Sequence, residues 1–154
     1  MSGAVGGFRR DQFYGLTFHW WAVSRQGTIA QFTAGYAHIP VAVFDDQSAY
    51  ESALRYFDDL STTSSAQLSP WADVMQREQG GDFTIALKEA SRGLFVYDEE
   101  AYGPMYRLQA SPLSPIHLDL VPATIQLFLR QFVLTASDFG VAELIDPGCE
   151  LVCA

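Results

Sequence analysis

The side chains best able to hold a metal ion or act as nucleophiles are three histidines and two cysteines. They are His19, His38, His117, Cys149 and Cys153, and both cysteines lie close to the C-terminus. Zinc sites commonly combine two closely spaced ligand pairs, and no second pair accompanies the Cys-x-x-x-Cys spacing of this chain. The sequence therefore predicts no metal site and no cofactor.

The sequence motifs of nucleophilic and phosphate-binding enzymes are absent. The chain contains no Gly-x-Ser-x-Gly elbow, no Walker loop and no Gly-x-Gly-x-x-Gly turn. Such motifs hold a serine at the top of a sheet or wrap backbone N–H groups around a phosphate. We therefore assign no catalytic residue and expect a protein that is not an enzyme.

Carboxylates are more abundant, and several of them are adjacent in the sequence. A glycosidase needs two carboxylates at a defined separation around a sugar, whereas adjacent side chains diverge on a helix or strand. We therefore interpret these residues as solvated surface, helix caps or contacts to a partner. The candidate contact residues are Asp45, Asp46, Asp58, Asp59, Asp98, Glu99 and Glu100.

The charge balance favours a protein partner with a basic surface. The chain has 18 acidic and 9 basic residues, which gives a formal net charge of −9. A negative field of this kind repels nucleic acid and anionic membranes and attracts basic surfaces. We expect a partner protein, and neither nucleic acid nor a membrane.

An aromatic-lined pocket is the alternative site. Its candidate residues are His19, Trp21, Tyr36 and His38, which would serve a small-molecule-binding domain or an enzyme. A site of that kind is concave and partly apolar, with convergent polar groups. The more ordinary role for His19 is a hydrogen bond within a sheet.

The clearest predicted element is a β-hairpin near residues 16–33. Large apolar residues occupy both faces of its first strand, with Trp20 and Trp21 on opposite sides. A strand of this composition is covered on both faces. Gly27 can adopt the positive φ that the tight turn requires.

Helices are predicted where apolar residues recur every three or four positions behind a capping residue. Asp45 or Asp46 caps the first helix, and Ser69 with Pro70 opens the second, which ends before Gly80. Asp82 caps a third helix. Besides the second helix, the predicted helices span residues 47–60, 83–91 and 122–131.

Further strands are predicted at 94–97 and 105–110, and around 132–136 and 141–145. Hairpins outnumber βαβ units in this order. The predicted fold class is therefore α+β, with a mostly antiparallel sheet of about five to six strands and helices packed on one side.

Alternation within 105–110 predicts which side chains face the core. Tyr106, Leu108 and Ala110 alternate with Arg107 and Gln109. We therefore expect the three apolar side chains to point inward and the two polar ones to point outward.

The 154 residues suit a single domain. We expect a loose Gly-rich segment at 1–7, one α+β domain at 8–148 and a C-terminal tail at 149–154. The N-terminus lacks a basic start followed by an apolar stretch, and no segment is long and apolar enough to span a membrane. The expected location is the cytoplasm.

Three blocks of sequence carry a resemblance. Residues Trp20–Gly35 run as an aromatic strand, a turn with Gly, an apolar strand and a Gly-containing loop, followed by Pro40; Gly93–Asp98 and Leu118–Pro122 are the other blocks. Over roughly residues 14–135 the chain resembles uncharacterised small acidic bacterial proteins of the kind found as immunity partners in polymorphic or contact-dependent toxin systems. The resemblance implies a binding protein, and it carries over no functional residue because its motifs are hairpin and cap signals.

Two functions of different classes therefore stand beside each other. The leading hypothesis is a non-enzymatic protein-binding domain, an immunity protein that neutralises a cognate bacterial toxin through its acidic surface. The alternative is the small-molecule-binding domain or enzyme with an aromatic-lined pocket. A structural adaptor is a third hypothesis, and only the acidic surface supports it.

Overall fold

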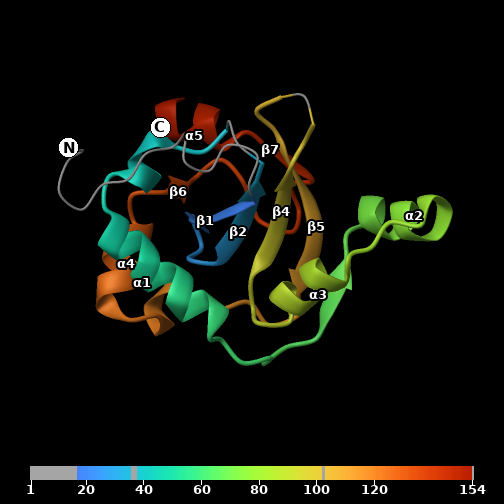
Figure 1. Cartoon of the computed structure of the whole chain (residues 1–154), viewed down its shortest axis with the longest axis horizontal. Coiled ribbons are helices and arrows are strands. Elements are labelled where there is room, and N and C mark those ends of the chain that lie inside the picture. The colour runs from blue at the N-terminus through green and yellow to red at the C-terminus, as the bar shows by residue number, and fades with distance from the viewer. Residues whose placement is uncertain (1–16, 36–37, 102, 154) are drawn as a thin grey trace.

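The computed structural model describes residues 17–35, 38–101 and 103–153. Within these ranges the chain forms an α+β fold, with a mixed seven-stranded sheet and five α-helices (Figure 1). The predicted loose segment 1–7 and the candidate residue Tyr36 lie outside the described residues.

The sheet has the strand order β3-β5-β4-β2-β1-β6, and β7 also pairs with β5. Its strands are β1 (Phe18–Ser24), β2 (Ile29–Ala34), β3 (Ala66–Leu68), β4 (Phe95–Glu99), β5 (Tyr106–Pro112), β6 (Val133–Leu134) and β7 (Leu144–Ile145).

The expectation of a mostly antiparallel sheet is wrong, because the sheet is mixed. The β1–β2 hairpin is antiparallel as predicted, but β2 pairs in parallel with β4, and β1 pairs in parallel with β6. The chain between β2 and β4 forms three α-helices and β3 before it returns in the same direction as β2. Hairpin signals report only neighbouring strands, so they do not reveal this long crossover.

The helices are α1 (Gln47–Asp58), α2 (Pro70–Gln79), α3 (Thr84–Ala90), α4 (Ala123–Leu129) and α5 (Pro147–Cys153), with 3-10 turns at Val41–Phe44 and Leu118–Leu120. Two predicted caps are confirmed: Asp46 Oδ1 accepts from the backbone N–H of Ala49 at 3.0 Å, and Ser69 Oγ accepts from that of Ala72 at 3.1 Å. Helix α5 runs from Pro147 to Cys153, so residues 149–153 of the expected C-terminal tail are helical.

Both faces of β1 are covered, which confirms the prediction from its two tryptophans. Trp20 is 0% exposed and Trp21 is 1% exposed. Trp20 stacks on Phe32 with ring centroids 4.6 Å apart, and its edge contacts Phe132 in the C-terminal segment. Trp21 stacks on Phe57 of α1 at 4.9 Å on the opposite face. The sheet therefore separates an aromatic layer from the layer that contains α1.

A β-bulge interrupts the pairing of β4 with β5. Val96 pairs with Ala110 and Tyr97 pairs with Leu108, so Gln109 is an extra residue on β5. Leu108 belongs to the main aromatic core, whereas Ala110 packs with Val96 beneath α3. The prediction that Leu108 and Ala110 face the same way, with Gln109 outward, is therefore wrong, because a bulge re-aims the side chains beyond it.

Helix α2 projects from the body of the molecule, as Figure 1 shows at the end of β3. Its first turn is held by Trp71, whose ring lies 5.0 Å from the Arg107 guanidinium of β5. Phe83, just before α3, meets the same ring edge-on at 6.0 Å. The contact with Arg107 is a cation–π interaction, and it links the projecting helix to the sheet.

Candidate functional site

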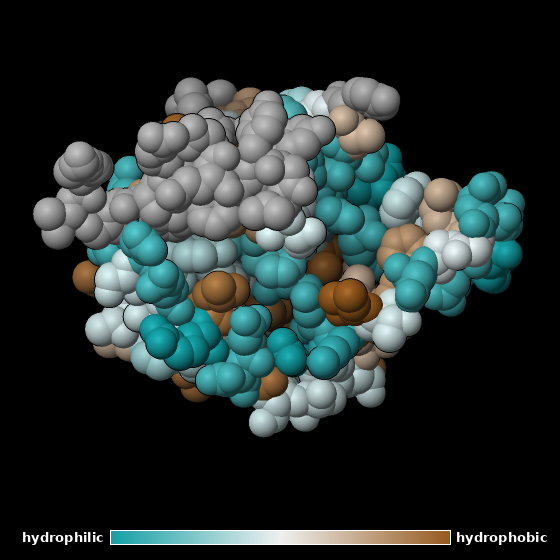
Figure 2. All heavy atoms as spheres, in the orientation of Figure 1, coloured by the Kyte–Doolittle hydropathy of each residue, from teal (hydrophilic) through white to brown (hydrophobic). Residues whose placement is uncertain are grey.

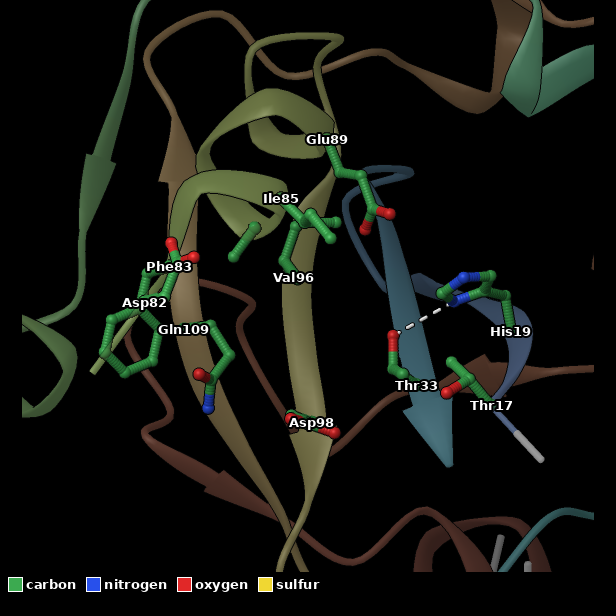
Figure 3. Close-up of a pocket in the computed structure, with 11 residues that line it drawn as sticks. Thr17, His19, Thr33, Asp82, Phe83, Ile85, Glu89, Val96, Asp98 and Gln109 are labelled. Atoms are coloured by element: carbon green, nitrogen blue, oxygen red, sulfur yellow. Dashed lines mark hydrogen bonds between the residues drawn. The ribbon is translucent and has the colours of Figure 1, made fainter. Parts of the chain in front are cut away.

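A groove lies on the sheet face that α3 partly covers, and its volume is about 310 Å³ (Figure 3). We call it the polar groove. Three of its eleven described lining residues are acidic, and none of the eleven is Lys or Arg. The lining residues are Thr17, His19, Thr33, Asp82, Phe83, Ile85, Ala86, Glu89, Val96, Asp98 and Gln109.

The surface around the groove mixes hydrophilic and apolar residues. In the space-filling view teal residues between α1 and α3 are interspersed with brown ones, and a brown patch lies at α3 (Figure 2). Ile85 of α3 lines the groove and is 71% exposed. The site therefore combines acidic and polar walls with one apolar edge, as many binding sites do.

Strand register places the floor of the groove. His19 of β1 pairs with Thr33 of β2, and Thr33 pairs in turn with Asp98 of β4. Because residues directly opposite one another share a face of a sheet, these three side chains form one row across three strands. Figure 3 shows all three along the lower and right-hand parts of the site.

His19 is held within this row as a sheet histidine. Its Nδ1 lies 3.0 Å from Thr33 Oγ1, and its carbonyl oxygen accepts a 2.6 Å hydrogen bond from the Tyr50 hydroxyl of α1. Burial lowers the pKa of His19, although the Asp58 carboxylate acts in the opposite direction. The imidazole is therefore mainly neutral at neutral pH.

Glu89 points from α3 toward the sheet and ends a chain of hydrogen bonds. Trp21 Nε1 donates to Gln31 Oε1 at 3.0 Å, and Gln31 Nε2 donates to the Glu89 carboxylate. Burial raises the pKa of Glu89 to about 7; Arg92 opposes this effect, and Asp58 adds to it. At neutral pH this carboxyl group exchanges readily between its acid and its carboxylate.

The other two acids of the groove are more exposed. Desolvation in the groove raises the pKa of Asp98, opposed by a hydrogen bond from the Glu99 backbone and supported by the adjacent Glu99 and Glu100 carboxylates. Asp82 Oδ1 accepts hydrogen bonds from the Thr84 backbone N–H at 3.0 Å and from the Thr84 hydroxyl at 2.7 Å. These bonds lower the pKa of Asp82, so it is a carboxylate at neutral pH.

Gln109 is the buried polar residue of the groove, with only 7% of its surface exposed. Its Nε2 donates to the Arg107 carbonyl oxygen at 3.2 Å. Among the described residues, its Oε1 accepts no hydrogen bond. A buried acceptor without a donor is costly, so Oε1 is suited to a donor supplied from outside.

Two of the seven predicted contact acids act at the groove. Asp98 lines it, and Asp58 at the end of α1 is close enough for its charge to raise the pKa of Glu89. Asp45, Asp46 and Asp59 are exposed at the ends of α1 and are not among its lining residues. The structure thus gathers part of the predicted acidic set and leaves these three on the open surface.

Glu99 and Glu100 have structural partners. Glu99 accepts hydrogen bonds from the backbone N–H groups of Gly35 at 2.9 Å and His38 at 3.2 Å, and it lies 3.0 Å from His38 Nδ1. Glu100 accepts from Arg107 Nη2 at 2.9 Å. Glu99 therefore holds the backbone amides of Gly35 and His38, and Glu100 holds the guanidinium that lies over the Trp71 ring.

Of the three described residues of the predicted aromatic pocket, one lines the polar groove. His19 lines the polar groove, whereas Trp21 is buried against Tyr50 and Phe57 of α1. His38 is engaged by Glu99. Tyr36 lies outside the described residues, and His19 is the only described member of that set that lines the groove.

Sequence reasoning missed Glu89 and Gln109 as site residues. Glu89 falls within the predicted helix 83–91, but which helix face meets the sheet follows from the crossover after β2. Gln109 follows from the bulge, which has no signal in the apolar alternation of β5. In neither case did a local pattern identify the residue.

No family model, curated protein or solved structure matches this chain. Across residues 17–35, 38–101 and 103–153, no group of three or more His, Cys, Asp and Glu side chains is placed to hold a metal ion. None of the helices in these ranges has the length and apolar character needed to cross a bilayer. The polar groove is therefore the feature of the described residues that bears on function.

Proposed function

We propose that this protein is a non-enzymatic protein-binding domain, an immunity protein that neutralises a cognate bacterial toxin in the cytoplasm. The observation that carries the proposal is the polar groove, which has three acids and no Lys or Arg among its described lining residues. A cavity with this lining attracts a basic side chain from another protein.

The charges beside the groove support the same partner chemistry. Asp58 is exposed on α1 and its charge acts on Glu89 in the groove, and the chain as a whole has a net charge of −9. A field of this sign accelerates association with a basic surface, to rates on the order of 10⁸ M⁻¹s⁻¹ at low salt. Neutralisation follows when the bound domain covers the basic surface that the toxin uses.

A small-molecule-binding domain or enzyme is the second candidate. It is favoured by a groove of about 310 Å³ that contains neutral His19 and Glu89, whose pKa is raised to about 7. A group that titrates near neutral pH suits acid–base chemistry. Against it stands the lack of any described contact between His19 and Glu89 that would couple them.

The deciding experiment is co-expression with the protein encoded beside this one, followed by growth and binding measurements. The wild-type chain is expected to restore growth and to bind the neighbour in a salt-dependent way. Asp98→Lys, which reverses a charge in the groove, is expected to weaken binding by at least about tenfold. Glu78→Lys changes the net charge equally on exposed α2 and is the matched control.

Two results would overturn the proposal. One is a toxic neighbour whose activity is unchanged by excess wild-type protein. The other is equal protection by the wild type and Asp98→Lys, which would remove the groove from the binding surface. Conversion of a metabolite by the purified chain, abolished by Glu89→Gln, would support the second candidate instead.

A further inference from the structure

One end of the polar groove is lined by two carboxylates, an amide and an aromatic ring. Asp98, Asp82 and Gln109 line this end together with Phe83, and Figure 3 shows Gln109 between Phe83 and Asp98. Carboxylates accept hydrogen bonds and donate none when ionised. The group that fits here must therefore be a donor, and a positive charge on it would be favoured.

The amide of Gln109 is oriented by its own strand. Because Nε2 donates to the Arg107 carbonyl oxygen, the opposite side of the amide carries Oε1. Gln109 is more than nine-tenths buried, and no described donor reaches Oε1. The bulge on β5 is what brings this acceptor to the groove, since the extra residue is Gln109 itself.

Asp98 has a cation opposite it in the sheet and is nevertheless left without an ion pair. Arg107 is its register partner on β5, but the Arg107 guanidinium pairs with Glu100 at 2.9 Å and lies over the Trp71 ring. In the described ranges of the chain, Asp98 forms no ion pair. The Arg107 guanidinium is thus held by its contacts with Glu100 and Trp71 and does not pair with Asp98.

Within the described residues, only one of the two carboxylate oxygens of Asp82 accepts hydrogen bonds. Its Oδ1 takes both hydrogen bonds from Thr84, which orients the carboxylate at the start of α3. Among the residues that the structure describes, Oδ2 has no hydrogen bond. Phe83 follows directly in the chain and also lines the groove.

We propose that the end of the polar groove formed by Asp82, Asp98, Gln109 and Phe83 is a socket for the guanidinium group of an arginine side chain. A guanidinium carries five N–H donors in a planar fork, tolerates partial desolvation and stacks on aromatic rings. A lysine ammonium is a strongly hydrated point charge that cannot span separated acceptors in this way. The groove, at about 310 Å³, has the size of a small ligand site.

The source of the arginine rests on the proposed function, which supplies a basic protein partner. Recognition of a guanidinium group by the socket does not depend on the proposed function, so an experiment can reject either one without rejecting the other. Arginine presented on a protein surface gains affinity from the contacts around it, whereas a free arginine derivative uses the socket alone.

The test is a titration of the full chain with N-acetyl-arginine amide, followed by amide NMR shifts. The Gln109 side-chain amide and the backbone amides of Phe83 and Asp98 are expected to shift and to saturate at millimolar concentrations. N-acetyl-lysine amide is expected to bind about tenfold more weakly, and the neutral citrulline analogue is expected to cause no shift at these positions.

Two conservative variants test the acceptors. Gln109→Met keeps the side-chain length and removes Oε1, and Asp98→Asn keeps the shape and removes the charge. Each is expected to weaken binding of the arginine probe by at least about tenfold. Glu78→Gln on exposed α2 is the matched control and should bind as the wild type does.

The outcomes separate the socket from the proposed function. Equal binding of the arginine and lysine probes, or an arginine probe whose shifts avoid all three reporter amides, would overturn the socket. Neutralisation of the neighbouring toxin that is unchanged in Gln109→Met would show that the toxin does not use it. Saturable arginine binding without any toxin binding would leave the socket in place and reject the proposed function.

Discussion

Replacing Glu89 with glutamine tests whether burial of this side chain in the folded protein disfavours its charged form. Glu89 is half-buried on the side of α3 that meets the sheet, and it accepts a hydrogen bond from Gln31 Nε2. The amide oxygen of glutamine can accept the same bond, and the side chain keeps its shape. The variant therefore removes the charge and retains the contact.

The magnitude follows from the pKa of Glu89, which burial raises from 4.5 to about 7. At about 1.4 kcal/mol per pH unit, this difference corresponds to roughly 3 kcal/mol, and solvent screening of a half-buried group lowers it to about 1–3 kcal/mol. Between these two pKa values the folded chain binds a proton that the unfolded chain does not. The free energy of unfolding therefore falls as pH rises from about 4.5 to about 7 and loses nothing further above that.

The assay is urea denaturation at about pH 5 and about pH 8, followed by tryptophan fluorescence. The wild type should lose about 1–3 kcal/mol of unfolding free energy relative to Glu89→Gln across this interval. Burial lowers the pKa of His19, so its contribution is lost as pH falls below 6.5, in the opposite direction. Because His19 is present in both proteins, its contribution cancels in the comparison.

The control is Glu51→Gln, which removes a carboxylate from the exposed surface of α1. It should follow the wild type at both pH values. The reasoning is refuted if Glu89→Gln keeps the full pH dependence of the wild type. It is also refuted if the exposed control flattens that dependence as much as the groove variant does.

Three further predictions concern stability and loop order. Asp46→Ala removes the cap of α1 and should lower the free energy of unfolding by about 1 kcal/mol in chemical denaturation; an unchanged midpoint would count against the cap. Gly140→Ala should cost about 1–3 kcal/mol, because φ is +87° and the new Cβ would lie 2.6 Å from Phe95 Cε1. Gly80→Ala, which meets nothing within 4 Å, should cost less, and the reverse order would contradict this account. Glu99→Ala should accelerate hydrogen exchange at the Gly35 and His38 backbone amides, because both lose their acceptor; unchanged exchange would show that other contacts protect them.

Local sequence patterns predicted the elements whose determinants lie within a few residues. The hairpin around Gly27, the two-sided burial of Trp20 and Trp21, and the cap at Ser69 are all confirmed. Each depends on alternation, on a turn residue or on a side chain that reaches the next helical turn. The parallel pairing of β2 with β4 depends on contacts across some sixty residues, and the sequence pattern does not contain it.

The site was predicted less well than the fold, for the same reason. Asp98 and His19 were named separately, one as a contact acid and one as a pocket histidine, and their shared row appears only through Thr33. Glu89 depends on how α3 lies on the sheet, and Gln109 depends on one extra residue in β5.

The bulge in β5 also determines which changes in chain length this strand can accept. Before Gln109, even-numbered residues such as Leu108 point to the aromatic layer; beyond it, Ala110 points to the layer beneath α3. One extra residue thus reverses which side chains of β5 point to each face of the sheet, so apolar side chains of this one strand lie in both layers. Exchange of one amino acid for another at this position is a local event, whereas removal of the residue would turn every later side chain of β5 to the wrong face. In descendants of this sequence we therefore expect insertions and deletions to collect in the connecting loops, and the spacing between Leu108 and Ala110 to remain constant even where the residue between them changes.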